Sequence, residues 1–125
     1  MDHNMVGWFE IPVTDMQRAK KFYEKVFAIA ISIHDLEGFK MGWFPMAPDK
    51  MGATGSLVQH EMYEPSDKAG ALLYFSCADV ANELGRVEAA GGSIIQPKKE
   101  IGGGHGFMGL IKDSEGNRLG LHSQQ

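Results

Sequence analysis

The chain has 125 residues, the length of one domain, with 43% hydrophobic and 22% charged residues, as in ordinary globular proteins. Its formal net charge is -4 and no stretch concentrates Lys or Arg, which argues against a nucleic acid or an anionic membrane as partner. The one cysteine, Cys77, excludes an internal disulfide and a cysteine-based zinc cluster. The stretch MDHNMVGW does not resemble a signal peptide and no apolar run reaches membrane-spanning length, so we expect a cytoplasmic protein.

The first predicted strand, WFEIPV, carries a carboxylate among large apolar side chains. Because side chains alternate across a strand, Phe9, Ile11 and Val13 share one face, which is predicted to meet a helix. Trp8 and Glu10 share the other face, which is predicted to line a cavity. A carboxylate is rarely buried without a partner, so Glu10 is a candidate functional residue.

A helix is predicted to follow, ending near Phe27. Its apolar residues recur at helical spacing: Met16, Ala19, Tyr23 and Val26. Thr14 with Gln17 forms a capping-box pattern, and Asp15 is the alternative N-cap. Three short apolar segments rich in strand-forming residues come next: IAISIHDL, FKMGWFPM and GATGSLVQHEM.

The same order of elements then repeats. The strand LLYFSC is followed by a helix that Asp79 caps and that Gly91 and Gly92 end, and then by the strands SIIQP, GFMGLIKD and RLGLHS. The predicted fold class is therefore α+β, with two tandem βαβββ modules forming a curved mixed sheet around a cavity. We expect one domain over 1–125, with module one at about 5–62 and module two at about 70–123.

The motifs of both modules resemble a known family. IPVTDMQRAKKFYEKVF in the first module, and ADVANELGRVEAAGG with DSEGNRLGLHS in the second, are similar to the vicinal oxygen chelate superfamily. That superfamily includes glyoxalase I, the bleomycin-resistance proteins and the extradiol dioxygenases. The resemblance covers nearly the whole chain and implies the glyoxalase-like fold. It implies less about activity, because one scaffold hosts several chemistries.

The resemblance also implies where a metal would bind. The metal enzymes of the superfamily commonly have a His or Gln at the start of each module's first strand and a Glu on its last strand. The positions that match hold Trp8, Leu72 and Gly120, none of which has a ligating side chain. The fourth position lies within ATGSLVQHE and is not fixed by the sequence.

Two polar residues stand next to these positions. Glu10 and His122 each lie two residues beyond a vacated ligand position, on the predicted cavity face. The pair is a candidate for a displaced metal site, for acid–base catalysis, or for a structural ion pair.

Further residues are candidates for substrate binding. Tyr74 takes the place of Glu10 in the second module, and Trp8 and Trp43 offer aromatic surface to a flat or apolar ligand. In EIGGGHGFMG, three glycines precede His105 and Phe107. The segment is either a lid that brings His105 to the ligand or an ordinary flexible hairpin connection.

Three functional hypotheses remain open at this point. One is a glyoxalase- or dioxygenase-type enzyme, a lyase or an oxidoreductase, using a divalent metal (Zn, Ni, Fe or Mn) at Glu10 and His122. Another is a metal-free protein that sequesters a small molecule, as the bleomycin-resistance proteins do. The third is metal-free acid–base catalysis by the same two residues. In each case the partner is a small-molecule ligand, and the resemblance implies a homodimer.

Overall fold

A computed structural model describes residues 3–125. The elements of the first module are β1 (Phe9–Pro12), α1 (Met16–Phe27), β2 (Ser32–Leu36), β3 (Phe39–Trp43) and β4 (Gly55–Gln59). Those of the second are β5 (Tyr74–Ser76), α2 (Val80–Val87), β6 (Ser93–Glu100), β7 (Phe107–Lys112) and β8 (Arg118–Ser123). The order strand, helix and three strands therefore occurs twice, as the sequence predicts.

Both helices begin at an aspartate cap. The Asp15 carboxylate accepts a hydrogen bond from the backbone N–H of Arg18 at 3.1 Å, so Asp15, and not Thr14, caps α1. The Asp79 carboxylate accepts from the N–H of Ala81 at 2.9 Å at the start of α2. α1 ends where predicted, and α2 ends at Val87, one turn before the glycine pair at which we expected it to stop.

Each module forms a four-stranded mixed sheet with the same topology. The strand orders are β1-β4-β3-β2 and β5-β8-β7-β6. In each sheet the first strand pairs in parallel with the last, and the other pairs are antiparallel. The α+β class and the duplicated unit are confirmed. The two sheets remain separate, because β1 and β5 each form one edge and do not pair with each other.

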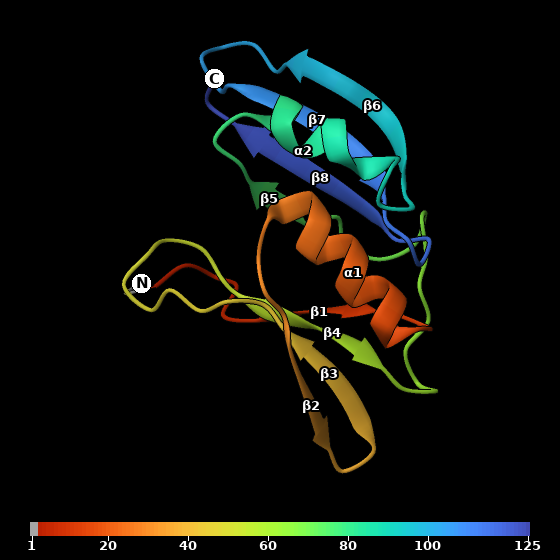
Figure 1. The fold of residues 1–125 in the computed structure, drawn as a ribbon. Helices are drawn as coiled ribbons and strands as arrows, with labels where there is room; N and C mark the ends of the chain where they lie inside the picture. The colour runs from red at the N-terminus through yellow and green to blue at the C-terminus, as the bar shows by residue number, and fades with distance from the viewer. Residues whose placement is uncertain (1–2) are drawn as a thin grey trace.

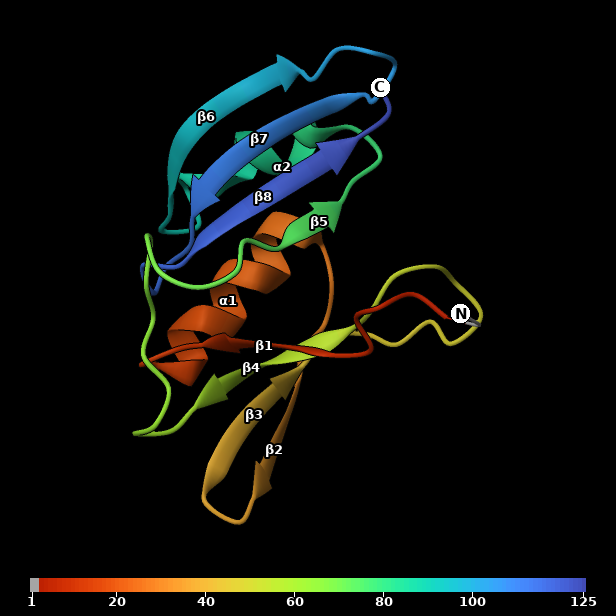
Figure 2. The ribbon, with the colours of Figure 1, turned by 180° about the vertical axis from the view of Figure 1, so that it is seen from behind.

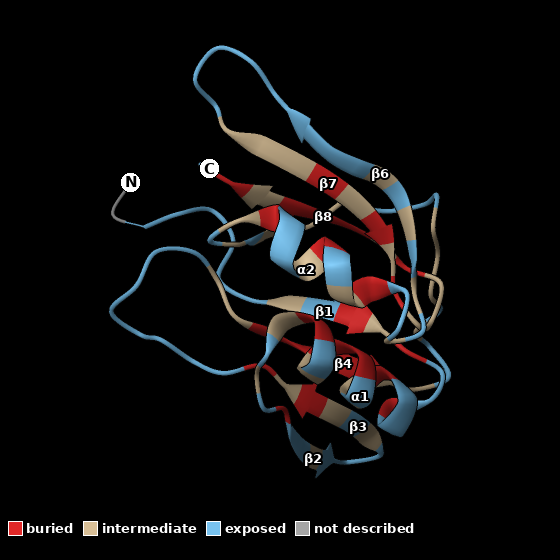
Figure 3. Cartoon of the chain, turned by 45° about the horizontal axis from the view of Figure 1, so that its top comes forward, coloured by how far each residue is buried: buried red, intermediate tan, exposed pale blue. Residues whose placement is uncertain are grey.

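The helices cover one face of each sheet and pack against each other (Figure 1). Seen from behind, the opposite faces of both sheets carry no helix (Figure 2). We call these the open faces. The buried residues lie where helices meet sheets (Figure 3). They include Ile11, Val13, Leu57, Ile111 and Leu121, each at most 3% exposed.

The turn between β7 and β8 holds the two modules together. Glu115, in this turn, accepts hydrogen bonds from the backbone N–H groups of Thr14 and Asp15, both at 2.9 Å. Its other oxygen lies 2.6 Å from Nε of Arg18 on α1. The Asn117 side chain donates to the carbonyl of Pro12 at 2.7 Å. The DSEGN motif of the second module thus fixes the start of the first helix.

Candidate small-molecule site

The alternation predicted for the first strand of each module is present. In the first module Ile11 and Val13 are buried, whereas Trp8 is 39% exposed and Glu10 is exposed on the open face. In the second, Phe75 packs against the core and Tyr74 is 51% exposed. The open faces therefore present the side chains that the sequence assigned to them.

Glu10 has a partner that the sequence did not indicate. The Tyr63 hydroxyl donates to Glu10 Oε1 at 2.5 Å, and this hydrogen bond is the main cause of a raised Tyr63 pKa. Tyr63 lies in the irregular segment between β4 and β5, where no periodicity marks a face. Only the path of that segment brings the phenol to the carboxylate.

Aromatic side chains also lie on the open face of module one. The Trp8 ring meets the Trp43 ring edge-on, with centroids 6.1 Å apart, and the His34 ring lies 4.0 Å from Trp43. Ser56 of β4, opposite Glu10, is fully buried. The Ser56 hydroxyl and Trp43 Nε1 have no hydrogen-bond partner within residues 3–125.

His122 lies on the other sheet. It stands on β8 between Ser76 and Met108, and its Nε2 is 2.7 Å from the carbonyl oxygen of His105. Because a carbonyl only accepts, Nε2 carries the proton and Nδ1 is an acceptor in the neutral ring. The glycine-rich segment therefore contacts His122 through its backbone, not through the His105 imidazole.

The structure does not bring Glu10 and His122 together. The two residues stand on separate sheets, and the described residues contain no ion pair between them within 4.0 Å. Phe107 packs on the helix-covered side, where the Lys98 ammonium lies 4.6 Å from its ring centroid. Of the predicted site residues, Tyr74 and His122 share one pocket, and Trp8 and Trp43 share another surface.

The register identifies the fourth family ligand position. Tyr74 of β5 pairs with Gly120 of β8, and Glu10 of β1 pairs with Ser56 of β4. Because Tyr74 and Glu10 are equivalent in the two modules, Ser56 is the equivalent of Gly120. The four positions are therefore occupied by Trp8, Ser56, Leu72 and Gly120, which offer one neutral hydroxyl and neither a carboxylate nor an imidazole.

The position at Gly120 is also sterically closed. A Cβ added there would lie 2.5 Å from carbons of the Tyr74 ring, which lies across the strand. Over residues 3–125, no group of three or more His, Cys, Asp or Glu side chains is arranged to hold a metal ion. The residues present do not fit the divalent metal that the family resemblance implies.

A first pocket opens on the open face of module two. It has a volume of about 590 Å³, within the range typical of small-molecule sites. Six of its lining residues are Tyr74, Ser76, Lys99, Glu100, Met108 and His122. It combines apolar walls with a histidine and charges of both signs, so it can orient a polar ligand.

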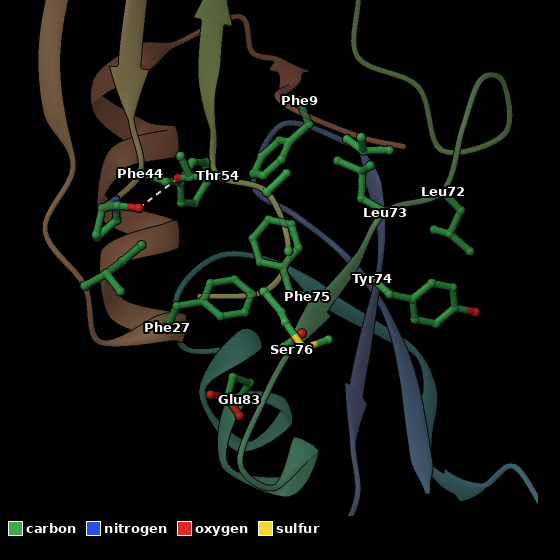
Figure 4. Close-up of a pocket in the computed structure, with 16 residues that line it drawn as sticks. Phe9, Phe27, Phe44, Thr54, Leu72, Leu73, Tyr74, Phe75, Ser76 and Glu83 are labelled. Carbon is green, nitrogen blue, oxygen red and sulfur yellow. Dashed lines mark hydrogen bonds between the residues drawn. The ribbon is translucent and has the colours of Figure 1, made fainter. Parts of the chain in front are cut away.

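A second pocket, also about 590 Å³, lies between the modules (Figure 4). Its wall includes Phe9, Phe27, Phe44 and Phe75, and Glu83 lies at the α2 end. The sequence assigns Phe9 and Phe75 to the core, and both do pack against it. They line a pocket as well because β1 and β5 remain apart, which no sequence pattern shows.

The structural comparisons place this architecture among known folds. Glyoxalase I from Zea mays superposes with a TM-score of 0.72 at 20% identity, over 94% of this chain and 45% of that one. This chain therefore spans about half of the maize protein. A glyoxalase-related enzyme from Fulvimarina pelagi gives a TM-score of 0.71 at 15% identity, covering 95% and 87%. At these identities the likeness shows the fold alone.

A third similar structure is the fosfomycin resistance protein FosX from Listeria monocytogenes, with a TM-score of 0.67, 16% identity, and 98% and 92% coverage. The comparison with curated proteins gives no significant match. Neither helix in the part of the chain that the structure describes is long and apolar enough to cross a membrane.

The sequence itself matches a family model over nearly its full length. The matched residues are 5–121, and the model is that of the Glyoxalase/Bleomycin resistance protein/Dioxygenase superfamily. The match agrees with the duplicated module, the DSEGN turn and the structural neighbours. The chain belongs to the Glyoxalase/Bleomycin resistance protein/Dioxygenase superfamily.

Proposed function

We propose that this protein binds a small polar molecule in the open-face pocket of module two without a metal at the family's ligand positions. The observation that carries the proposal is the occupation of those four positions by Trp8, Ser56, Leu72 and Gly120. A ring packed over Gly120 leaves no room there for a longer side chain. The pocket beside it, however, is open and lined by polar groups.

The His122 ring is the main recognition group of this pocket. Its Nε2 is engaged by the His105 carbonyl, which fixes the tautomer and the ring orientation. Nδ1 is left to accept a hydrogen bond from the ligand. Lys99 and Glu100 supply charges at the rim, and Met108 supplies apolar surface.

The fixed tautomer favours a second candidate function, metal-free proton transfer. An imidazole held by a carbonyl through one nitrogen accepts a proton at the other, as a general base does. This candidate keeps His122 as the catalytic residue. It leaves Glu10 outside the reaction, because Glu10 stands on the sheet of module one and accepts a hydrogen bond from Tyr63. Fosfomycin is a reasonable first probe, since FosX shares the fold.

The test combines metal analysis with ligand-dependent melting. The protein is incubated with Ni²⁺, Zn²⁺, Fe²⁺ and Mn²⁺, desalted and analysed for metal. We expect much less than one ion per chain. Stoichiometric metal that is lost in Glu10→Ala or His122→Ala would contradict the proposal. It would support the hypothesis of a displaced metal site at these two residues instead.

Ligand binding is measured by thermal shift with a panel of polar metabolites and fosfomycin, with and without a chelator. A ligand that binds only the folded state raises the melting temperature. We expect stabilisation that survives the chelator and is lost in His122→Ala. Turnover of the same ligand by the wild-type protein, absent in His122→Ala, would show that the protein is an enzyme. Binding without turnover would indicate a sequestering protein.

We also infer that the protein is a homodimer. Its accessible surface is 7662 Å², whereas a compact monomer of 13.7 kDa is expected to expose roughly 6,600 Å². The excess of about 1,000 Å² is comparable to the roughly 800 Å² that each partner buries in a standard interface. Light scattering at micromolar concentration is expected to give twice the chain mass, and a monomer at all concentrations would contradict the inference.

A further inference from the structure

We infer that the pocket between the modules is a separate binding site for an apolar compound that carries an ammonium group, with Glu83 as the counter-ion. Its aromatic wall lies on the helix-covered side of the strands, and at its rim it shares Tyr74 and Ser76 with the open-face pocket. Phe9 and Phe75, which line it, belong to the core-facing side of β1 and β5. The inference does not depend on the function proposed for the open-face pocket.

The wall of the pocket consists of aromatic rings from both modules. The Phe75 ring centroid is 4.8 Å from that of Phe27 and 5.7 Å from that of Phe9, and Phe9 lies 5.5 Å from Phe44 (Figure 4). Such a wall removes apolar surface of a ligand from water. Ring faces also attract a cation held near them.

One charged group marks the end of this wall. Among the pocket's lining residues, all within the described part of the chain, Glu83 is the only acidic side chain, and neither Lys nor Arg is among them. The Glu83 side chain is 13% exposed, so its carboxylate is largely shielded from water. The pocket therefore favours a positive ligand over a neutral or a negative one.

The Glu83 carboxylate is incompletely paired. Oε2 lies 3.5 Å from Nη2 of Arg86, a long contact to one oxygen only. Oε1 is buried and has no hydrogen-bond partner among residues 3–125. One long contact with Arg86 neutralises the carboxylate only in part, and a ligand ammonium in the pocket would give it a second cationic partner.

The neighbouring thiol lies close to the Glu83 carboxylate but carries no charge. Cys77 lies beside Glu83, and burial followed by the Glu83 charge raises the pKa of its thiol to about 12. Cys77 therefore stays neutral at physiological pH and adds no charge to the pocket. The volume of about 590 Å³ lies in the range of small-molecule sites and is large enough for a ligand with an aromatic ring.

Three probes of matched shape test the charge preference: 2-phenylethylamine, 2-phenylethanol and 3-phenylpropionate. Their affinities for the full chain are measured by NMR titration or calorimetry at neutral pH. We expect the ammonium compound to bind about tenfold or more tightly than the alcohol, as a charged hydrogen bond provides. The carboxylate is expected to bind more weakly than the alcohol.

Two variants assign the preference to Glu83. Glu83→Gln keeps the shape and is expected to reduce the affinity for the amine to that for the alcohol, with the alcohol affinity unchanged. Glu88→Gln changes an exposed carboxylate at the C-cap of α2 and is expected to leave all three affinities unchanged. Phe27→Leu is expected to weaken all three probes, and the melting temperature of each variant shows whether it folds.

Several results would overturn the inference. These are equal binding of amine and alcohol, a preference that survives in folded Glu83→Gln, and no binding of any probe at millimolar concentration. His122→Ala is expected to leave amine binding intact, because His122 lines the other pocket. Loss of amine binding in His122→Ala would show that the probes occupy the open-face pocket instead.

Discussion

At the residue scale, the carboxylate in the first strand has a clear environment. Glu10 is exposed on the open face and accepts a hydrogen bond from Tyr63, so it requires no buried counter-charge. The alternation of the strand was sufficient to predict its face. Its partner could not be predicted, because Tyr63 comes from an irregular segment about fifty residues away.

Cys77 gives a prediction at the same scale. With a pKa of about 12, only about one thiol in ten thousand is ionised at pH 8, and the thiolate is the reactive form. We expect iodoacetamide to leave the folded protein unmodified over a time in which the urea-unfolded chain reacts completely. Mass spectrometry measures the adduct, and rapid alkylation of the folded protein would show that the thiol is accessible and ionised.

At the element scale, β8 shows how one small residue determines what a sheet face can hold. Gly120 lies beneath the Tyr74 ring of the neighbouring strand. Its equivalent in module one, Ser56, lies opposite Glu10. The sequence shows that a ligand is missing at position 120, but only the pairing of β5 with β8 shows that an aromatic ring takes its place.

A double-mutant cycle tests this packing. Gly120→Ala alone is expected to destabilise the protein by about 1 kcal/mol, because the methyl group displaces the Tyr74 ring. In a Tyr74→Ala background the same change is expected to stabilise it by about 0.5 kcal/mol, since alanine restricts the unfolded chain. Urea unfolding measures both effects. The same sign in the two backgrounds would show that the ring is not the obstacle.

At the scale of the whole molecule, the modules are joined by a carboxylate. Burial alone would raise the pKa of Glu115, but hydrogen bonds from Arg18 and from the backbone at Asp15 and Thr14 outweigh burial and lower it from 4.5 to about 2. The folded state thus holds Glu115 ionised more strongly than the unfolded chain does. The resulting stabilisation is present above about pH 4.5 and is lost as the pH falls toward about 2.

Removing this charge therefore has an effect that depends on pH. Glu115→Gln is expected to lower the free energy of unfolding by about 2 kcal/mol at pH 7, because several donors lose an ionised acceptor. The difference from the wild-type protein is expected to shrink as the pH falls below 4. Denaturant unfolding at a series of pH values measures it, with Glu61→Gln, an exposed carboxylate, as control. If the difference in the free energy of unfolding stayed the same at every pH, the ionised form of Glu115 would not be the source of the stabilisation.

The sequence by itself determined the elements and their faces. Apolar periodicity, the cap at Asp79 and the repeated order of segments are local properties, so they could be predicted without the fold, whereas the structure decided for Asp15 over Thr14 as the cap of α1. The DSEGN motif and the helix patterns also indicated the superfamily, which the family match confirms.

Only the tertiary structure decided which of these residues meet. It separated Glu10 from His122, turned Phe107 toward the helices, joined Tyr63 to Glu10 and left a pocket with Glu83 between the modules. These outcomes depend on how two sheets are placed and on the path of irregular segments. Contacts between residues far apart in the chain leave no period in the sequence, so a single sequence reveals which side chains face a cavity but not which of them share it.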